Sequence, residues 1–252
     1  MANLRRFLSA GILLVWGLMF CFLYFSGKAG KILLPSFAFF ALIAGVVLVL
    51  MAVGRLLASK RVEAADCAHG LIDGGILRQI VCSVILVAPL LMAATYAPNG
   101  FDAKAVQNRG LVDSVKNLPA ASSQANPFVP KEADGNIKAQ TVDLLYAAEE
   151  PSMRDDFEDK EVELVGQYMP ATSNNASGDR FKLVSMYMVC CAADARPVAV
   201  TVQTDRRETI PEMSWVRVTG KATFPVEGGR PIPLVVSDSV KPCDPPESSF
   251  IY

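Results

Sequence analysis

The stretch "FKLVSMYMVCCAADARPVAVTV", residues 181–202, contains two strand-like segments on either side of a short loop. The first segment covers 181–189 and the second begins at Pro197, and both are rich in residue types favoured in strands. Between them, Asp194 is a natural turn former, and the residue before Pro197 is held extended. The stretch therefore predicts two neighbouring strands joined by a turn that contains two adjacent cysteines.

Three further segments raise the expected number of strands to five. They are "EVELVGQY" (161–168), "WVRVTGKATF" (215–224) and "IPLVVSDSV" (232–240). Gly166 and Gly220 interrupt two of them, which suits the bends of a small closed barrel. We expect an all-β, OB-like barrel in a domain at 138–252, with an open five-stranded sandwich as the alternative. A short helix is expected in "AQTVDLLYAAEE" (139–150), capped by Thr141.

The first 96 residues are of a different kind, because they contain three long apolar runs. The runs are 7–25, 32–51 and 80–96, and none of them contains Asp, Glu, Lys or Arg. Each is close to the roughly 17–25 residues that cross the apolar core of a bilayer. The expected fold class is therefore a membrane α-helical region of three transmembrane helices, 1–96, followed by the all-β domain.

The lysines and arginines of the short loops predict the orientation of these helices. Six lie before the first run or between the second and third, whereas the loop between the first two runs holds only Lys28 and Lys31. Because cytoplasmic loops carry the excess of basic residues, we expect a multi-pass inner-membrane protein with a cytoplasmic N-terminus. A Pro-rich linker at 97–137 and the β domain at 138–252 are then extracytoplasmic. Residues 97–252 hold sixteen basic and twenty-two acidic side chains, which argues against a nucleic-acid partner.

Small residues in and just after the first two apolar runs provide places for close helix contact. Gly11, Gly17, Gly45 and Gly54 are the glycines of this set. Small side chains let helix backbones approach one another in a membrane, so these positions are expected to contact a neighbouring helix.

Four segments, in order along the chain, resemble the YcgQ-like family of membrane proteins. They are "APNGFDAKAVQNRG" (97–110), the 181–202 stretch, "WVRVTGKATF" (215–224) and "CDPPESSFIY" (243–252). The most specific match is "MVCCAADARPV" (188–198). The resemblance implies a subunit of a two-component membrane permease complex, whose partner is a multi-spanning membrane permease, and it links some members to zinc limitation.

The adjacent Cys190 and Cys191 leave three roles open. In a regular strand successive side chains point to opposite faces, so binding of one ion by both thiols requires a turn. Such a turn would allow a metal site, zinc for example, formed by Cys190, Cys191, Asp194 and Cys243. A disulfide from either cysteine to Cys243 would tie the C-terminal tail to the barrel. The third possibility is that the two cysteines pack as small apolar side chains and have no further role.

The sequence contains no motif of a serine hydrolase, a zinc protease or a P-loop enzyme. We therefore expect a non-enzymatic accessory subunit of a membrane permease complex, embedded in the lipid bilayer. Its helices would dock on the permease, and its β domain would gate the permease or present substrate to it. The expected partner contacts are Asn108, Arg109, Gly110 and Arg196. The alternative is an extracytoplasmic metal-binding module that serves a transporter.

Overall fold

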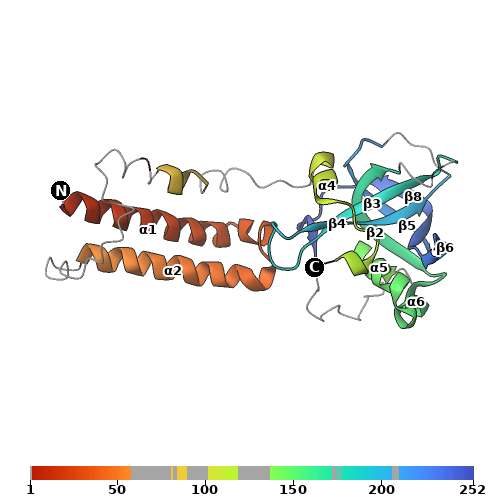
Figure 1. Ribbon diagram of the computed structural model, residues 1–252, viewed down its shortest axis with the longest axis horizontal. Coiled ribbons are helices and arrows are strands. Elements are labelled where there is room, and N and C mark those ends of the chain that lie inside the picture. Colours follow the sequence, from red (N-terminus) through yellow and green to blue (C-terminus); the bar gives the residue numbers. More distant parts are fainter. Residues whose placement is uncertain are drawn as a thin grey trace. The chain divides into compact units, whose positions relative to one another are not determined.

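The computed structural model describes residues 2–57, 81, 84–89, 102–118, 137–171, 175, 177–205 and 210–252 (Figure 1). The chain forms two compact units, Met1–Ala97 and Pro98–Tyr252. The first unit contains the long apolar helices and the second contains the β-sheet.

The N-terminal unit contains two helices that are long and apolar enough to cross a membrane. Helix α1 spans Ala2–Phe25 and α2 spans Pro35–Leu57, and the 3₁₀ turn Lys28–Lys31 lies between them. These helices coincide with the first two predicted runs. The third predicted run, 80–96, lies outside the described residues except for 81 and 84–89, which are helical.

Helices α1 and α2 approach one another closely where two glycines face each other. A Cβ atom added at Gly17 would lie 2.8 Å from the carbonyl oxygen of Gly45, and one added at Gly45 would lie 2.9 Å from the carbonyl oxygen of Gly17. Larger side chains at either position would push the backbones apart. Among the described residues, nothing lies within 4 Å of an added Cβ at Gly11 or Gly54, so these two glycines take no part in the contact between α1 and α2.

The five predicted strands are all present and close into a barrel. They are β2 (Glu161–Pro170), β3 (Arg180–Tyr187), β4 (Arg196–Gln203), β5 (Trp215–Thr223) and β8 (Leu234–Pro242). Neighbours follow the order β2–β5–β8–β4–β3, and β3 pairs back with β2 (Figure 1). All of these pairs are antiparallel except β4 with β8. This closed order is that of an OB-like barrel, which distinguishes it from the open sandwich.

Shorter elements surround the barrel. They are α4 (Ala103–Arg109), a 3₁₀ turn (Val115–Asn117), β1 (Ile137–Lys138), α5 (Thr141–Glu149), α6 (Pro151–Phe157), β6 (Val226–Glu227), β7 (Arg230–Pro231) and β9 (Phe250–Ile251). Strand β1 extends the sheet beside β2, β9 extends it beside β3, and β6 and β7 form a hairpin between β5 and β8.

The main core fills the barrel and reaches the two helices before β2. Buried side chains alternate along β5, as in Val216 and Val218, because successive residues point to opposite faces. Leu144 of α5 and Phe157 of α6 belong to the same cluster. Thr141 is the first residue of α5 rather than its cap, and its hydroxyl is 2.7 Å from that of Ser185.

Among the described glycines, Gly220 is the one where an added Cβ would make the shortest contact. The pairing of β5 with β8 shifts register between Thr219 and Gly220, and an added Cβ at Gly220 would lie 2.2 Å from the carbonyl oxygen of Val236. At Gly166 an added Cβ would lie 2.8 Å from a side-chain carbon of Leu183. Both predicted glycine positions are therefore sites where the barrel has no room for a side chain.

The segment 102–118, which the sequence placed in a linker at 97–137, packs against the barrel. Val106 of α4 is fully buried against Val184 and Ala199. The amide of Val112 donates to the carbonyl of Pro197 at 2.8 Å, and the Val112 carbonyl accepts from Ala199 at 3.0 Å. This part of the predicted linker is thus part of the β unit, while residues 119–136 lie outside the described residues.

Candidate functional site

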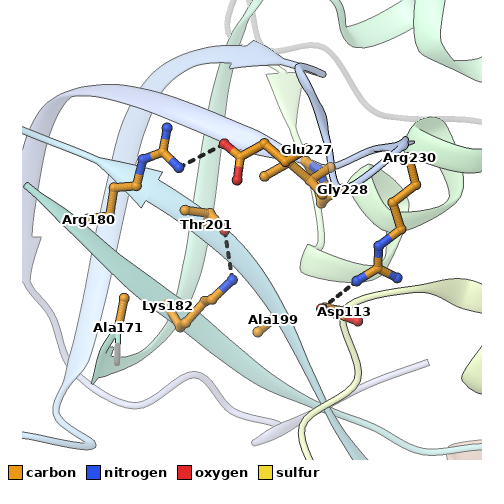
Figure 2. Close-up of a pocket in the computed structure, with 11 residues that line it drawn as sticks. Asp113, Ala171, Arg180, Lys182, Ala199, Thr201, Glu227, Gly228 and Arg230 are labelled. Carbon is orange, nitrogen blue, oxygen red and sulfur yellow. Dashed lines mark hydrogen bonds and ion pairs between the residues drawn. The ribbon is translucent and has the colours of Figure 1, made fainter. Parts of the chain in front are cut away.

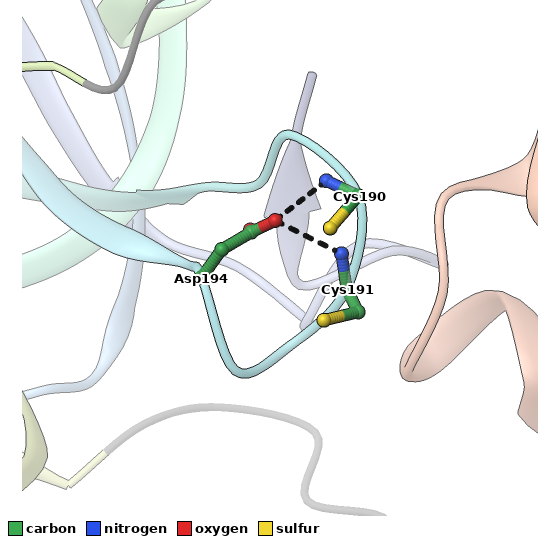
Figure 3. Close-up of side chains that lie close together, drawn as sticks. All are labelled: Cys190, Cys191 and Asp194. Atoms are coloured by element: carbon green, nitrogen blue, oxygen red, sulfur yellow. Dashed lines mark hydrogen bonds between the residues drawn. The ribbon is translucent and has the colours of Figure 1, made fainter.

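The loop between β3 and β4 is organised by the carboxylate of Asp194. It accepts hydrogen bonds from the backbone amides of Cys190 at 2.8 Å and Cys191 at 3.2 Å (Figure 3). It also accepts one from the amide of Val189 at 3.1 Å. A carboxylate that accepts several amide hydrogen bonds holds a tight turn in one conformation. The sequence folds this way because β3 ends at Tyr187, so the loop begins before the two cysteines.

This turn brings both thiols and the carboxylate together. One ligand atom each from Cys190, Cys191 and Asp194 lies within 4.8 Å of the other two. The alternation that separates neighbouring side chains on a strand does not apply here, because the cysteines lie in the turn and not in β3. Two sulfurs and one carboxylate oxygen are donors that a zinc ion accepts.

A hydrogen bond to Asp194 suppresses ionisation of the neighbouring Cys190 thiol. Hydrogen bonding to Asp194, with a further contribution from Cys191, raises the pKa of the Cys190 thiol to about 12. Burial acts to raise the pKa of Asp194, but the Cys190 thiol and the three backbone amides together lower it below its usual value. At neutral pH the loop therefore holds a carboxylate beside a protonated thiol.

Cys243 lies apart from this cluster, at the end of β8. Its amide donates to the carbonyl of Trp215 at 3.0 Å, and burial raises the pKa of its thiol. Of the predicted metal ligands, the structure brings together Cys190, Cys191 and Asp194 but not Cys243. The three cysteines of the β unit are all free thiols.

The predicted partner contacts lie beside the same loop. The guanidinium of Arg109 donates to the carbonyls of Ala192 at 3.0 Å and Ala195 at 2.7 Å. Arg196 donates in turn to the carbonyl of Arg109 at 3.2 Å. The two arginines therefore join α4 to the cysteine loop, whereas Asn108 and Gly110 are exposed.

A pocket of about 220 Å³ opens on the outer face of β3 and β4 (Figure 2). Its charged lining residues come from distant parts of the chain and are Asp113, Arg180, Lys182, Glu227 and Arg230. The guanidinium of Arg180 lies 2.8 Å from Glu227, and that of Arg230 lies 2.7 Å from Asp113. The pocket therefore combines three basic and two acidic side chains.

Models of two domains from one family match the chain. The DUF1980 N-terminal domain matches residues 8–112, and the DUF1980 C-terminal domain matches residues 130–252. The chain is a two-domain DUF1980 protein. This agrees with the resemblance read from the 181–202 stretch, which lies within the C-terminal match.

Comparisons with individual proteins add little to the family assignment. No curated protein matches the chain. Among solved structures, a small single-stranded DNA-binding protein from Streptomyces coelicolor is similar, with 13% sequence identity and a TM-score of 0.24. The similarity covers 34% of the DUF1980 chain and 95% of the other.

Sequence reasoning missed the pocket of the DUF1980 C-terminal domain, although part of its signal was present. Arg180 and Lys182 alternate with the buried Phe181 and Leu183, which indicates two basic side chains on the outer face of β3. Glu227 of the β6–β7 hairpin pairs with Arg180, and Asp113 of the segment after α4 pairs with Arg230; local sequence patterns do not predict such pairings.

Proposed function

We propose that this DUF1980 protein is a non-enzymatic accessory subunit of a membrane permease complex. Its helices dock on a multi-spanning permease within the lipid bilayer. The OB-like domain stands on the extracytoplasmic side, with the N-terminus in the cytoplasm, and gates the permease or presents substrate to it. The observation that carries the proposal is the apolar outer surface of α1 and α2.

The outer surface of α1 and α2 is too apolar to be stable in contact with water. Large apolar side chains point outward from both helices, among them Phe22, which is 50% exposed, and Leu50, which is 64% exposed. Exposed apolar area on this scale is stable in contact with lipid or with another apolar surface. A subunit that only needed an anchor would require one span, so the paired helices favour a role in contact with a membrane partner.

The two open glycines are the positions best suited to close contact with that partner. Gly17 and Gly45 lie in the contact between α1 and α2, whereas no described residue lies within 4 Å of an added Cβ at Gly11 or Gly54. A neighbouring helix could approach the backbone at these two positions without displacing either helix of the pair.

Co-purification tests this proposal. The tagged full chain, expressed together with a multi-spanning permease of the kind that the family resemblance implies, is expected to retain that permease in mild detergent. The double variant Gly11→Leu, Gly54→Leu is expected to retain roughly fivefold less, because bulky side chains block close helix contact. Val46→Leu, a change at a half-exposed position on α2, should retain the wild-type amount. A wild-type chain that migrates alone with the permease present would contradict the proposal.

A second candidate function is metal binding in the β3–β4 loop. The support for it is the grouping of Cys190, Cys191 and Asp194, whose donor atoms suit zinc, with a fourth position left for solvent or for a partner. Such a site would supply a metal to the complex or sense its concentration.

Metal analysis of the full chain, purified under reducing conditions and supplied with zinc, tests the second candidate. About one equivalent of zinc is expected on the wild type and on Cys243→Ser, because Cys243 lies outside the cluster. The double variant Cys190→Ser, Cys191→Ser is expected to bind none. Equal zinc on the double variant and on the wild type would eliminate this site.

A further inference from the structure

The pocket on β3 and β4 is enclosed by elements that the barrel brings together. Lys182 of β3 and Thr201 of β4 form its floor, and the β6–β7 hairpin forms one wall with Glu227 and Arg230 (Figure 2). Asp113, from the segment that follows α4, lies beside Arg230, 2.7 Å from its guanidinium (Figure 2). The pocket thus lies on a surface whose strands are fixed by the barrel core.

Lys182 occupies the floor without a carboxylate partner. Its ammonium donates to the hydroxyl of Thr201 at 2.8 Å, and among the described residues no carboxylate lies within 4.0 Å of it. The two carboxylates of the pocket are already engaged, Glu227 with Arg180 and Asp113 with Arg230. Burial removes part of the water around this ammonium, and a single hydrogen bond to a neutral hydroxyl does not fully offset that desolvation cost.

The electrostatic surroundings of Lys182 also leave its positive charge incompletely balanced. Burial is the main cause that lowers the pKa of Lys182, and the charges of Asp113 and Glu227 only partly oppose it. Three basic and two acidic side chains leave one positive charge in excess across the pocket lining. An added anion would therefore meet a net attractive field and an ammonium with free donor capacity, since an ammonium has three N–H donors.

The lining also restricts the size and kind of ligand. A volume of about 220 Å³ is below the usual range for drug-sized ligands, which begins at roughly 300 Å³. The described lining residues include no aromatic side chain on which a nucleic-acid base could stack. These features favour a small ion over an oligonucleotide.

We propose that this pocket binds a small anion through carboxylate or phosphate oxygens, with the Lys182 ammonium as its central ligand. Arg180 and Arg230 stand on either side and supply further donors at the cost of loosening their own ion pairs. Bound oxygens would add charge-assisted hydrogen bonds to Lys182 that Thr201 alone does not provide.

Calorimetric titration of the full chain in detergent tests this site with two probes, inorganic phosphate and succinate. Saturable binding of at least one is expected, and the probe that binds identifies phosphate or carboxylate as the preferred group. Lys182→Met is expected to weaken binding by about tenfold or more, because it removes the charge and keeps the length of the side chain. Lys182→Arg should retain part of the affinity. The matched control Lys221→Met, at an exposed lysine on β5, should bind as the wild type does.

A measurement on the wild type covers the case in which Lys182→Met does not fold. A saturating concentration of the bound probe is expected to slow acetylation of Lys182 and to leave acetylation of Lys221 unchanged, as read by peptide mass spectrometry. Absence of saturable heat with both probes would overturn the proposal, as would equal protection of the two lysines. No permease takes part in these measurements, so their outcome is separate from that of the proposed function.

Discussion

Replacing Asp194 by asparagine is expected to speed alkylation of Cys190 at pH 8 by roughly 10- to 50-fold. The neighbouring carboxylate is the main reason that the pKa of the Cys190 thiol is about 12. Without that charge the pKa falls toward its ordinary value, and the thiolate fraction at pH 8 increases by several hundredfold. The lower basicity of the new thiolate offsets part of this gain, because nucleophilicity falls with pKa.

The asparagine variant removes the charge of Asp194 and keeps part of its role in the turn. Oδ2 of Asp194 accepts from the amides of Cys190 and Cys191, and Oδ1 accepts from the amide of Val189. Asparagine has one acceptor oxygen, which can keep the two bonds to Cys190 and Cys191 while the bond to Val189 is lost. The measurement is iodoacetamide labelling of the full chain in the presence of a chelator, followed by peptide mass spectrometry. Cys243 serves as the internal reference, because burial is the main cause of its raised pKa and Asp194 takes no part in it.

The pH dependence of labelling gives a second check on the same charge. In the wild type, labelling of Cys190 should continue to increase with pH up to the highest accessible value, since its pKa is about 12. In Asp194→Asn it should level off at a lower pH. Identical pH profiles for the two proteins would contradict the assignment of the raised pKa to Asp194.

Gly220→Ala is expected to destabilise the barrel by about 3–5 kcal/mol. The added methyl group would lie 2.2 Å from the Val236 carbonyl oxygen and 2.6 Å from the Ser237 Cα. Both obstacles are backbone atoms of β8, so they cannot move aside as the end of a flexible side chain can. Thermal unfolding of the full chain, followed by the β signal in circular dichroism, should shift down by roughly 6–20 °C.

Gly178→Ala is the matched control for this prediction. Gly178 has a φ of 70° with nothing within 4 Å of an added Cβ, so the same substitution there has a conformational cost alone. That cost is about 1 kcal/mol, and the transition should fall by only a few degrees. Equal shifts for the two variants would mean that β8 moves away from Gly220 without loss of stability.

The barrel could be predicted from sequence because its evidence is local. Short segments rich in Val, Tyr, Phe and Thr predicted all five strands, and the two interior glycines favoured OB-like closure over the open sandwich, which the strand order confirms. The packing of α4 could not be predicted in this way. It depends on Val106 meeting Val184 and Ala199, which are far along the chain, while the composition around it is that of a linker.

The cysteine loop and the pocket also differ in how close together their residues lie in the sequence. The cysteine loop was predicted because its three donors lie within five residues, and only the turn made by Asp194 had to be inferred. Cys243 was added as a fourth ligand on the assumption that the tail folds back to the loop, but the pairing of β8 with β5 holds it elsewhere. The pocket was missed because Asp113, Lys182 and Glu227 meet only after the barrel has closed.

The segment that contains Arg109, Val112 and Asp113 connects these two sites within five residues of chain. Arg109 holds two carbonyls of the cysteine loop, Val112 pairs with β4, and Asp113 holds Arg230 at the wall of the pocket. Binding at the cysteine loop that displaces this segment would therefore change the free energy of binding at the pocket, and binding at the pocket would do the same to the loop. Thermodynamic linkage makes such an effect reciprocal: a ligand in the pocket that altered the affinity of the loop for a metal would have its own affinity altered by the same factor.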